Sequence, residues 1–145
     1  LAGLASDYVA AAYDKHLFGG KTLQHLPTAP VFVFNATSVQ SGALWRFTRS
    51  YIRDYRVGEI KSPTLRLSAA VAASSAFPPF LSPAKLPLNP KSFTPKSGED
   101  LQFSPYDENA ILTDGGVYDN LGLEAEAALN AISELVADKF HEETM

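Results

Sequence analysis

The sequence has 145 residues, of which 46% are hydrophobic and 19% are charged, and this is the composition of an ordinary globular domain with one core. Its net charge of -4 argues against nucleic acid as a partner, because nucleic-acid binding requires a dense cationic surface. The absence of cysteine excludes disulfides, thiolate metal sites and a cysteine nucleophile.

The first expected elements are a helix and two strands. Apolar residues at helical spacing predict a helix over residues 6–18, ended by Gly19 and Gly20. The consecutive apolar residues 31–34 predict a central strand that is covered on both faces. A looser alternation over residues 44–51 predicts a more exposed strand, with its aromatic side chains facing the core.

The middle of the chain changes from an alanine-rich helix to an irregular segment. Residues 65–77 have high helix propensity, and Pro78 and Pro79 end the helix. Prolines then recur as far as Pro105, which predicts a long irregular excursion, either a lid or a loop that covers the surface. No apolar run approaches the roughly 20 residues of a membrane-spanning helix, so we do not expect an integral membrane protein. The sequence leaves the cellular location open.

The last expected elements follow the order strand, turn, helix. Ile111 and Leu112 lead into Asp114, Gly115 and Gly116, and an amphipathic helix is expected over residues 123–140. An acidic residue at the end of a buried strand occupies the position where open α/β sheets place ligands and catalytic groups. The two glycines would let neighbouring backbone approach it closely. Local chemistry also allows a simpler interpretation, a turn capped by an aspartate.

Three segments in this order resemble patatin-like phospholipases. They are FNAT with SG after a strand (residues 34–37 and 41–42), AAVAASSAFP (residues 69–78) and DGGVYDN (residues 114–120). The resemblance spans about residues 31–124. It implies that residues 1–145 are the C-terminal portion of a single patatin-like phospholipase domain. The implied fold is α/β, with a mostly parallel central sheet flanked by helices on both faces.

The same resemblance implies a lipid acyl hydrolase, a phospholipase or esterase, that acts through a Ser-Asp dyad without a metal or other cofactor. Asp114 matches the family's general base. The family's nucleophile is the serine of a GxSxG motif, and no serine here has glycine two residues before and two residues after it. Leu1 is not an initiator methionine, so we expect an N-terminal half with GxSxG to be absent and the isolated chain to be inactive. The alternative is a non-catalytic patatin-like binding or regulatory module.

The implied partners are a phospholipid or acyl-ester lipid substrate and either the missing N-terminal half or another chain. Four arginines offer a peripheral membrane contact through anionic head groups, or else form a solvated strand edge with Asp54 and Glu59 as partners. These are Arg46, Arg49, Arg53 and Arg56. Ser74 and Ser75 are expected to allow close helix packing, and the three histidines are expected at solvated positions.

Overall fold

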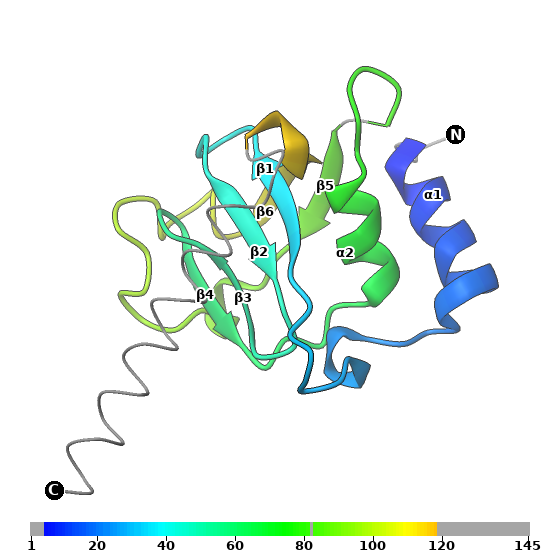
Figure 1. Ribbon diagram of the computed structural model, residues 1–145. Coiled ribbons are helices and arrows are strands. Elements are labelled where there is room, and N and C mark those ends of the chain that lie inside the picture. Colours follow the sequence, from blue (N-terminus) through cyan, green and yellow to red (C-terminus); the bar gives the residue numbers. More distant parts are fainter. Residues whose placement is uncertain (1–4, 82, 119–145) are drawn as a thin grey trace, which may run out of the picture.

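The computed structural model describes residues 5–81 and 83–118. Within this part of the chain, six strands form one curled antiparallel sheet in the order β4-β3-β2-β1-β6-β5 (Figure 1). The strands are β1 (Phe34–Ser38), β2 (Leu44–Phe47), β3 (Tyr51–Asp54), β4 (Gly58–Lys61), β5 (Ala84–Pro87) and β6 (Asn109–Asp114). The two α-helices are α1 (Ala5–Tyr13) and α2 (Leu67–Ser74).

The expected mostly parallel sheet flanked by helices is wrong. Every strand pair is antiparallel, including β1 with β6 and β5 with β6. The connections that join β1 to β2, β2 to β3 and β3 to β4 are residues 39–43, 48–50 and 55–57. A parallel pair requires a crossover of about a dozen residues or more, so connections this short dictate hairpins. What had been expected as one strand over residues 44–51 is β2, the turn of the second of these hairpins and the first residue of β3.

The core lies on one face of the sheet. Cross-strand partners on this face include Ala36 with Trp45, and Phe47 with Ile52, and all four are buried. The inward aromatic face expected for this region is therefore confirmed for Trp45 and Phe47. The opposite face is mixed: it carries Arg46 and Arg53, but also the buried residues Thr37 and Leu44.

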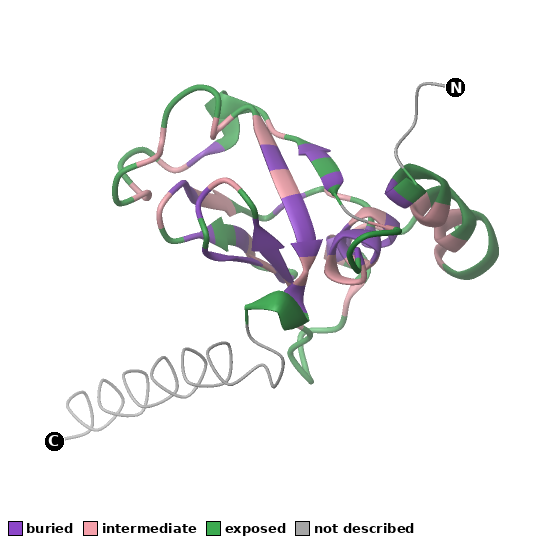
Figure 2. Cartoon of the chain, turned by 90° about the horizontal axis from the view of Figure 1, so that it is seen from above, coloured by how far each residue is buried: buried purple, intermediate pink, exposed green. Residues whose placement is uncertain are grey.

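Helix α2 packs on β1, β5 and β6, and α1 packs on α2, so the helices form successive layers over the same part of the sheet (Figures 1 and 2). The alanine-rich helix is thus confirmed, although it is shorter than expected. Its buried residues are mostly alanine, and such small side chains let α2 lie close to the strands. The N-terminal helix is confirmed too: it continues through a π-helical turn, Asp14–Phe18, and ends at Gly19 with a positive φ of 56°.

The proline-rich segment is more ordered than the sequence suggested, because it contains β5 and a 3-10 turn, Pro90–Ser92. Beyond that turn it covers the outer edge of β4, where Thr94 N–H donates to the Glu59 carbonyl at 2.8 Å. Phe93 packs edge-on against Trp45 with ring centroids 6.5 Å apart. The later part of the expected excursion, from residue 88 to Pro105, therefore fits the covering-loop interpretation better than the lid.

Two further predictions concern other parts of the chain. The strand expected over residues 31–34 begins later, at Phe34, and Val31 and Phe32 are largely exposed. The amphipathic helix expected over residues 123–140 lies outside the described residues. Among the helices that are described, none combines the length and the apolar character that crossing a bilayer requires.

Candidate functional site

Asp114 is the last residue of β6, an interior strand that lies between β1 and the edge strand β5. Its backbone lies opposite Ala36 of β1, and its half-buried side chain caps the 3-10 turn Gly115–Val117. Carboxylate Oδ1 accepts a hydrogen bond from Gly116 N–H at 2.7 Å. The predicted strand end and the predicted aspartate-capped turn are therefore both present, and the cap holds the carboxylate at the edge of the sheet.

The end of α2 fixes the backbone at this position. Asp114 N–H and Thr113 Oγ1 both donate to the carbonyl of Ala76, at 3.0 Å each. From the other side, Thr37 Oγ1 donates to the Asp114 carbonyl at 2.9 Å. Asp114 is thus tied to β1 and to the residue that follows the alanine-rich helix, which brings the three resembling segments of the sequence together.

Gly115 is required here by lack of space. A Cβ added at this position would lie 2.5 Å from the backbone oxygen of Asn35 and 3.0 Å from its carbonyl carbon. Real Cβ atoms do not approach backbone this closely, so the chain from Asp114 onward must move if any side chain is introduced.

We therefore expect Gly115→Ala to destabilise the fold by about 2 kcal/mol and to displace Asp114. Urea unfolding followed by fluorescence of the single tryptophan measures the change. Gly42→Ala is the control: Gly42 has a φ of 68° but no atom within 4 Å of an added Cβ, so only backbone strain of about 1 kcal/mol is expected. Equal losses in the two variants would contradict the packing explanation.

A buried serine–aspartate pair, Ser41 with Asp54, was not singled out by the sequence. Ser41 Oγ hydrogen-bonds to Asp54 Oδ2, and both residues are buried. Asp54 Oδ1 also accepts from Arg56 N–H at 2.8 Å and from Val57 N–H at 3.4 Å. Because these bonds hold the two neighbouring turns together and the serine is inaccessible, the pair has the properties of a structural tie rather than of a reactive centre.

The four arginines contact protein groups. Arg56 forms two hydrogen bonds to the carboxylate of Asp100, at 3.0 and 2.7 Å, and a third to the Ser41 carbonyl. The bonds from Arg56 lower the pKa of Asp100. Arg53 lies 3.9 Å from Glu59, and Arg49 donates to the Leu26 carbonyl. Arg46 also has an interaction partner within the protein. The strand-edge interpretation fits these contacts better than the head-group site.

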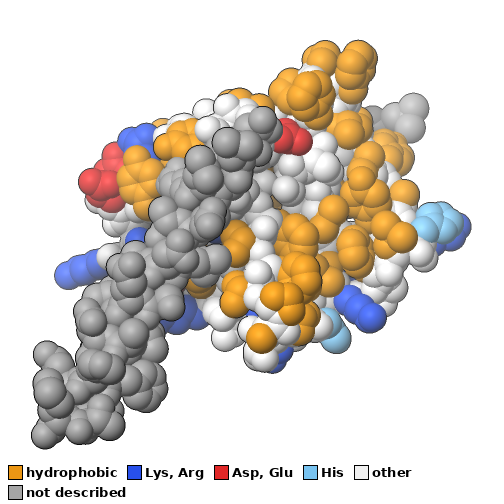
Figure 3. All heavy atoms as spheres, in the orientation of Figure 1, with side chains coloured by type: hydrophobic (Ala, Val, Ile, Leu, Met, Phe, Trp, Pro, Cys, Tyr) orange, Lys and Arg blue, Asp and Glu red, His pale blue; other side chains and the backbone are white. Residues whose placement is uncertain are grey.

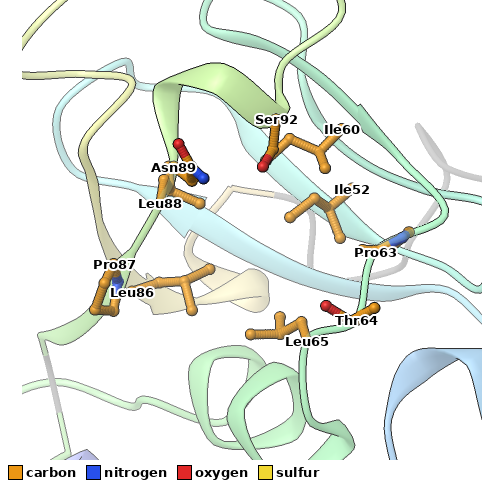
Figure 4. A pocket seen from close by; sticks show the side chains of 10 residues that line it. All are labelled: Ile52, Ile60, Pro63, Thr64, Leu65, Leu86, Pro87, Leu88, Asn89 and Ser92. Atoms are coloured by element: carbon orange, nitrogen blue, oxygen red, sulfur yellow. The ribbon is translucent and has the colours of Figure 1, made fainter.

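Two cavities among the described residues are formed without Asp114. One, of 220 Å³, separates β3 and β4 from β5, and Ile52, Leu65 and Leu86 point into it (Figure 4). A larger groove of 580 Å³ runs between α1, α2 and β5. Neither is lined by Asp114. Within residues 5–81 and 83–118 there is also no group of three His, Asp or Glu side chains placed to hold a metal.

Comparison with known proteins identifies the family. A family model described as patatin-like phospholipase matches residues 2–127. The chain belongs to the patatin-like phospholipase family. No curated protein and no solved structure matches it.

The match includes all of the described strands and both α-helices, and it extends across the loop that carries Asp114. Patatin-like phospholipases are lipid acyl hydrolases, so the family implies a hydrolase acting on lipid. The match agrees with the resemblance carried by the three sequence segments. The roles of individual residues are a separate question.

Proposed function

We propose that this patatin-like chain supplies the general base of a serine lipid acyl hydrolase, and that the base is Asp114. The observation that carries the proposal is the position of its carboxylate, at the end of the interior strand β6 and held there by Gly116 N–H. The contact of Gly115 with the Asn35 backbone supports it, because it explains why the residue after the acid is glycine.

In the proposed reaction, the Asp114 carboxylate accepts the proton of a serine hydroxyl as the serine oxygen attacks the ester carbonyl carbon. The tetrahedral intermediate collapses when the carbon–oxygen bond to the alcohol breaks, and the alcohol leaves with the proton held by Asp114. Water then attacks the acyl carbon while Asp114 accepts its proton, the bond between the acyl carbon and the serine oxygen breaks, the serine oxygen takes the proton back from Asp114, and the fatty acid is released. A phospholipid or another acyl-ester lipid is the proposed substrate class.

The serines of the described chain do not suit this role. Ser75 Oγ donates to the Val71 carbonyl within α2 at 2.8 Å, and Ser41 is buried against Asp54. No serine among the 145 residues has the GxSxG setting. We therefore propose that the nucleophile belongs to an N-terminal half of the same domain or to another chain. On this proposal residues 1–145 form the C-terminal portion, which is inactive alone.

The test is labelling with a fluorophosphonate, which reacts with activated serines, in the protein that contains both Asp114 and a GxSxG serine. Intact mass is compared between wild type and Asp114→Asn. One adduct in the wild type and none in the variant is the expected result. Equal labelling of the two proteins would contradict the role of Asp114. The absence of any adduct in the wild type would instead favour a non-catalytic binding or regulatory module.

A further inference from the structure

The chain turns sharply between α2 and β5 and exposes two aromatic side chains there. Phe77 is 63% exposed and Phe80 is 81% exposed, the highest value among the large hydrophobic residues that the structure describes. The turn projects beyond the end of α2 in Figure 1, and apolar side chains cover the corresponding part of the surface in Figure 3. Exposed apolar groups gathered in this way mark an interaction site rather than an ordinary surface.

The backbone of this turn has few free N–H groups, which lowers the free-energy cost of moving it from water into lipid. Pro78 and Pro79 have no N–H group. The N–H of Phe77 donates to the Ser75 carbonyl at 2.8 Å, and that of Leu81 donates to the Phe77 carbonyl at 3.0 Å. An unsatisfied backbone donor is costly in a lipid environment, and of the five residues of the turn all but Phe80 bring none.

Charge around the turn points to an uncharged surface. Residues 74–84 contain no acidic or basic side chain, and Lys85 is the first charged residue after the turn. A site for a polar protein partner or for anionic head groups would be expected to carry charges at its tip. Aromatic residues on a compact loop without charges instead match the boundary between head groups and acyl chains.

The turn is also joined to the candidate site. Phe77 directly follows Ala76, whose carbonyl accepts hydrogen bonds from Asp114 N–H and Thr113 Oγ1. On the other side of Asp114, Val117 and Tyr118 are 57% and 52% exposed. Whatever surface receives the turn is thereby brought to the edge of the sheet that carries the carboxylate.

We propose that the turn Phe77–Leu81 inserts into the surface of a zwitterionic phospholipid bilayer and holds the Asp114 edge of the sheet against it. The functional consequence rests on the proposed lipid hydrolase, because insertion would place ester substrates next to the general base. The contact itself requires only the apolar turn.

Flotation with vesicles of pure phosphatidylcholine tests the contact. The wild-type chain is expected to float with the vesicles, and Phe77→Ser combined with Phe80→Ser is expected to lower its partition coefficient about tenfold or more. Leu17→Ser is the matched control. Leu17 is 68% exposed, but it lies at the far end of the N-terminal helix from Ser6, which contacts Pro83 at the base of the turn. Equal partition of wild type and the double variant would overturn the proposal.

A second measurement does not depend on removing the phenylalanines. In Phe80→Trp, the added tryptophan is expected to shift to shorter emission wavelength with vesicles and to be quenched by brominated lipid, whereas buried Trp45 is not. A tryptophan at position 80 that remains unquenched while the protein floats would overturn insertion of this turn. If neither protein floats and gel filtration shows that the double variant dissociates a wild-type oligomer, the turn is a protein contact and the lipid proposal is wrong.

The test is independent of catalysis. Asp114→Asn is expected to float like the wild type, because the substitution leaves the turn intact. If Asp114 is not the general base, serine labelling will not depend on it, and vesicle binding will be unchanged. If the turn does not insert, flotation will not depend on Phe77 and Phe80, and labelling by a water-soluble fluorophosphonate will be unchanged.

Discussion

Replacing Asp114 by asparagine is expected to lower the rate of ester hydrolysis by about 10³-fold while leaving the fold intact. Asparagine keeps an oxygen that can accept the Gly116 N–H, so the turn after β6 retains its cap. It cannot accept the serine proton, so the step that forms the nucleophile is lost. The measurement is the initial rate on p-nitrophenyl butyrate, in the protein that also contains the nucleophilic serine.

Asp100→Asn is the matched control for this experiment. It removes one carboxylate in the same way, but Asp100 is an exposed residue that pairs with Arg56. Its hydrolysis rate should equal that of the wild type. If the two variants had the same rate, or if Asp114→Asn retained full activity, Asp114 would be only the cap of its turn.

The largest loss of stability is expected from Asp54→Ala. Asp54 is fully buried and accepts hydrogen bonds from Ser41 Oγ, Arg56 N–H and Val57 N–H. Removal of the carboxylate leaves these donors unsatisfied, and each buried donor costs about 1–3 kcal/mol. We expect the free energy of unfolding to fall by about 4 kcal/mol, measured by urea unfolding with Trp45 as the probe.

Two variants calibrate this result. Ser41→Ala removes one member of the pair and is expected to cost about 1–2 kcal/mol. Asp54→Asn keeps an acceptor for Arg56 N–H and provides a folded protein if Asp54→Ala does not fold. A loss below about 0.5 kcal/mol in Asp54→Ala would show that the pair is not a structural tie. A serine-labelling reaction that depended on Ser41 would show that it is reactive.

Local sequence patterns predicted the individual elements better than their arrangement. The alanine-rich helix, the helix that ends at Gly19 and the strand that ends at Asp114 all depend on near neighbours in the chain. Propensity, glycine at the helix end and a short apolar run are sufficient signals for them. The division of residues 44–51 between β2 and β3 was missed because Thr48 and Ser50 resemble strand residues, and only the pairing of Phe47 with Ile52 reveals the turn.

The predicted strand direction was wrong. The strand–turn–helix order near Asp114 and the family resemblance both favoured a parallel sheet, whereas the short connections require antiparallel pairs. Residues 48–50 and 55–57 are too short for crossovers, and this information was available in the sequence once the strands were correctly bounded. The Ser41–Asp54 pair had no such signal. Ser41 lies in the turn between β1 and β2 and Asp54 ends β3, and nothing in the sequence indicates that both would be buried.

The sequence by itself determined the family, the acidic residue before two glycines and the uncharged proline–phenylalanine turn, because each is a property of consecutive residues or of an ordered set of motifs. Only the tertiary structure decided that Gly115 lies against Asn35, that Ala76 holds the backbone of Asp114, and that the turn after Ala76 is exposed beside it. Those contacts join positions about 40 to 80 residues apart, and their geometry depends on strand pairing and packing rather than on local propensity.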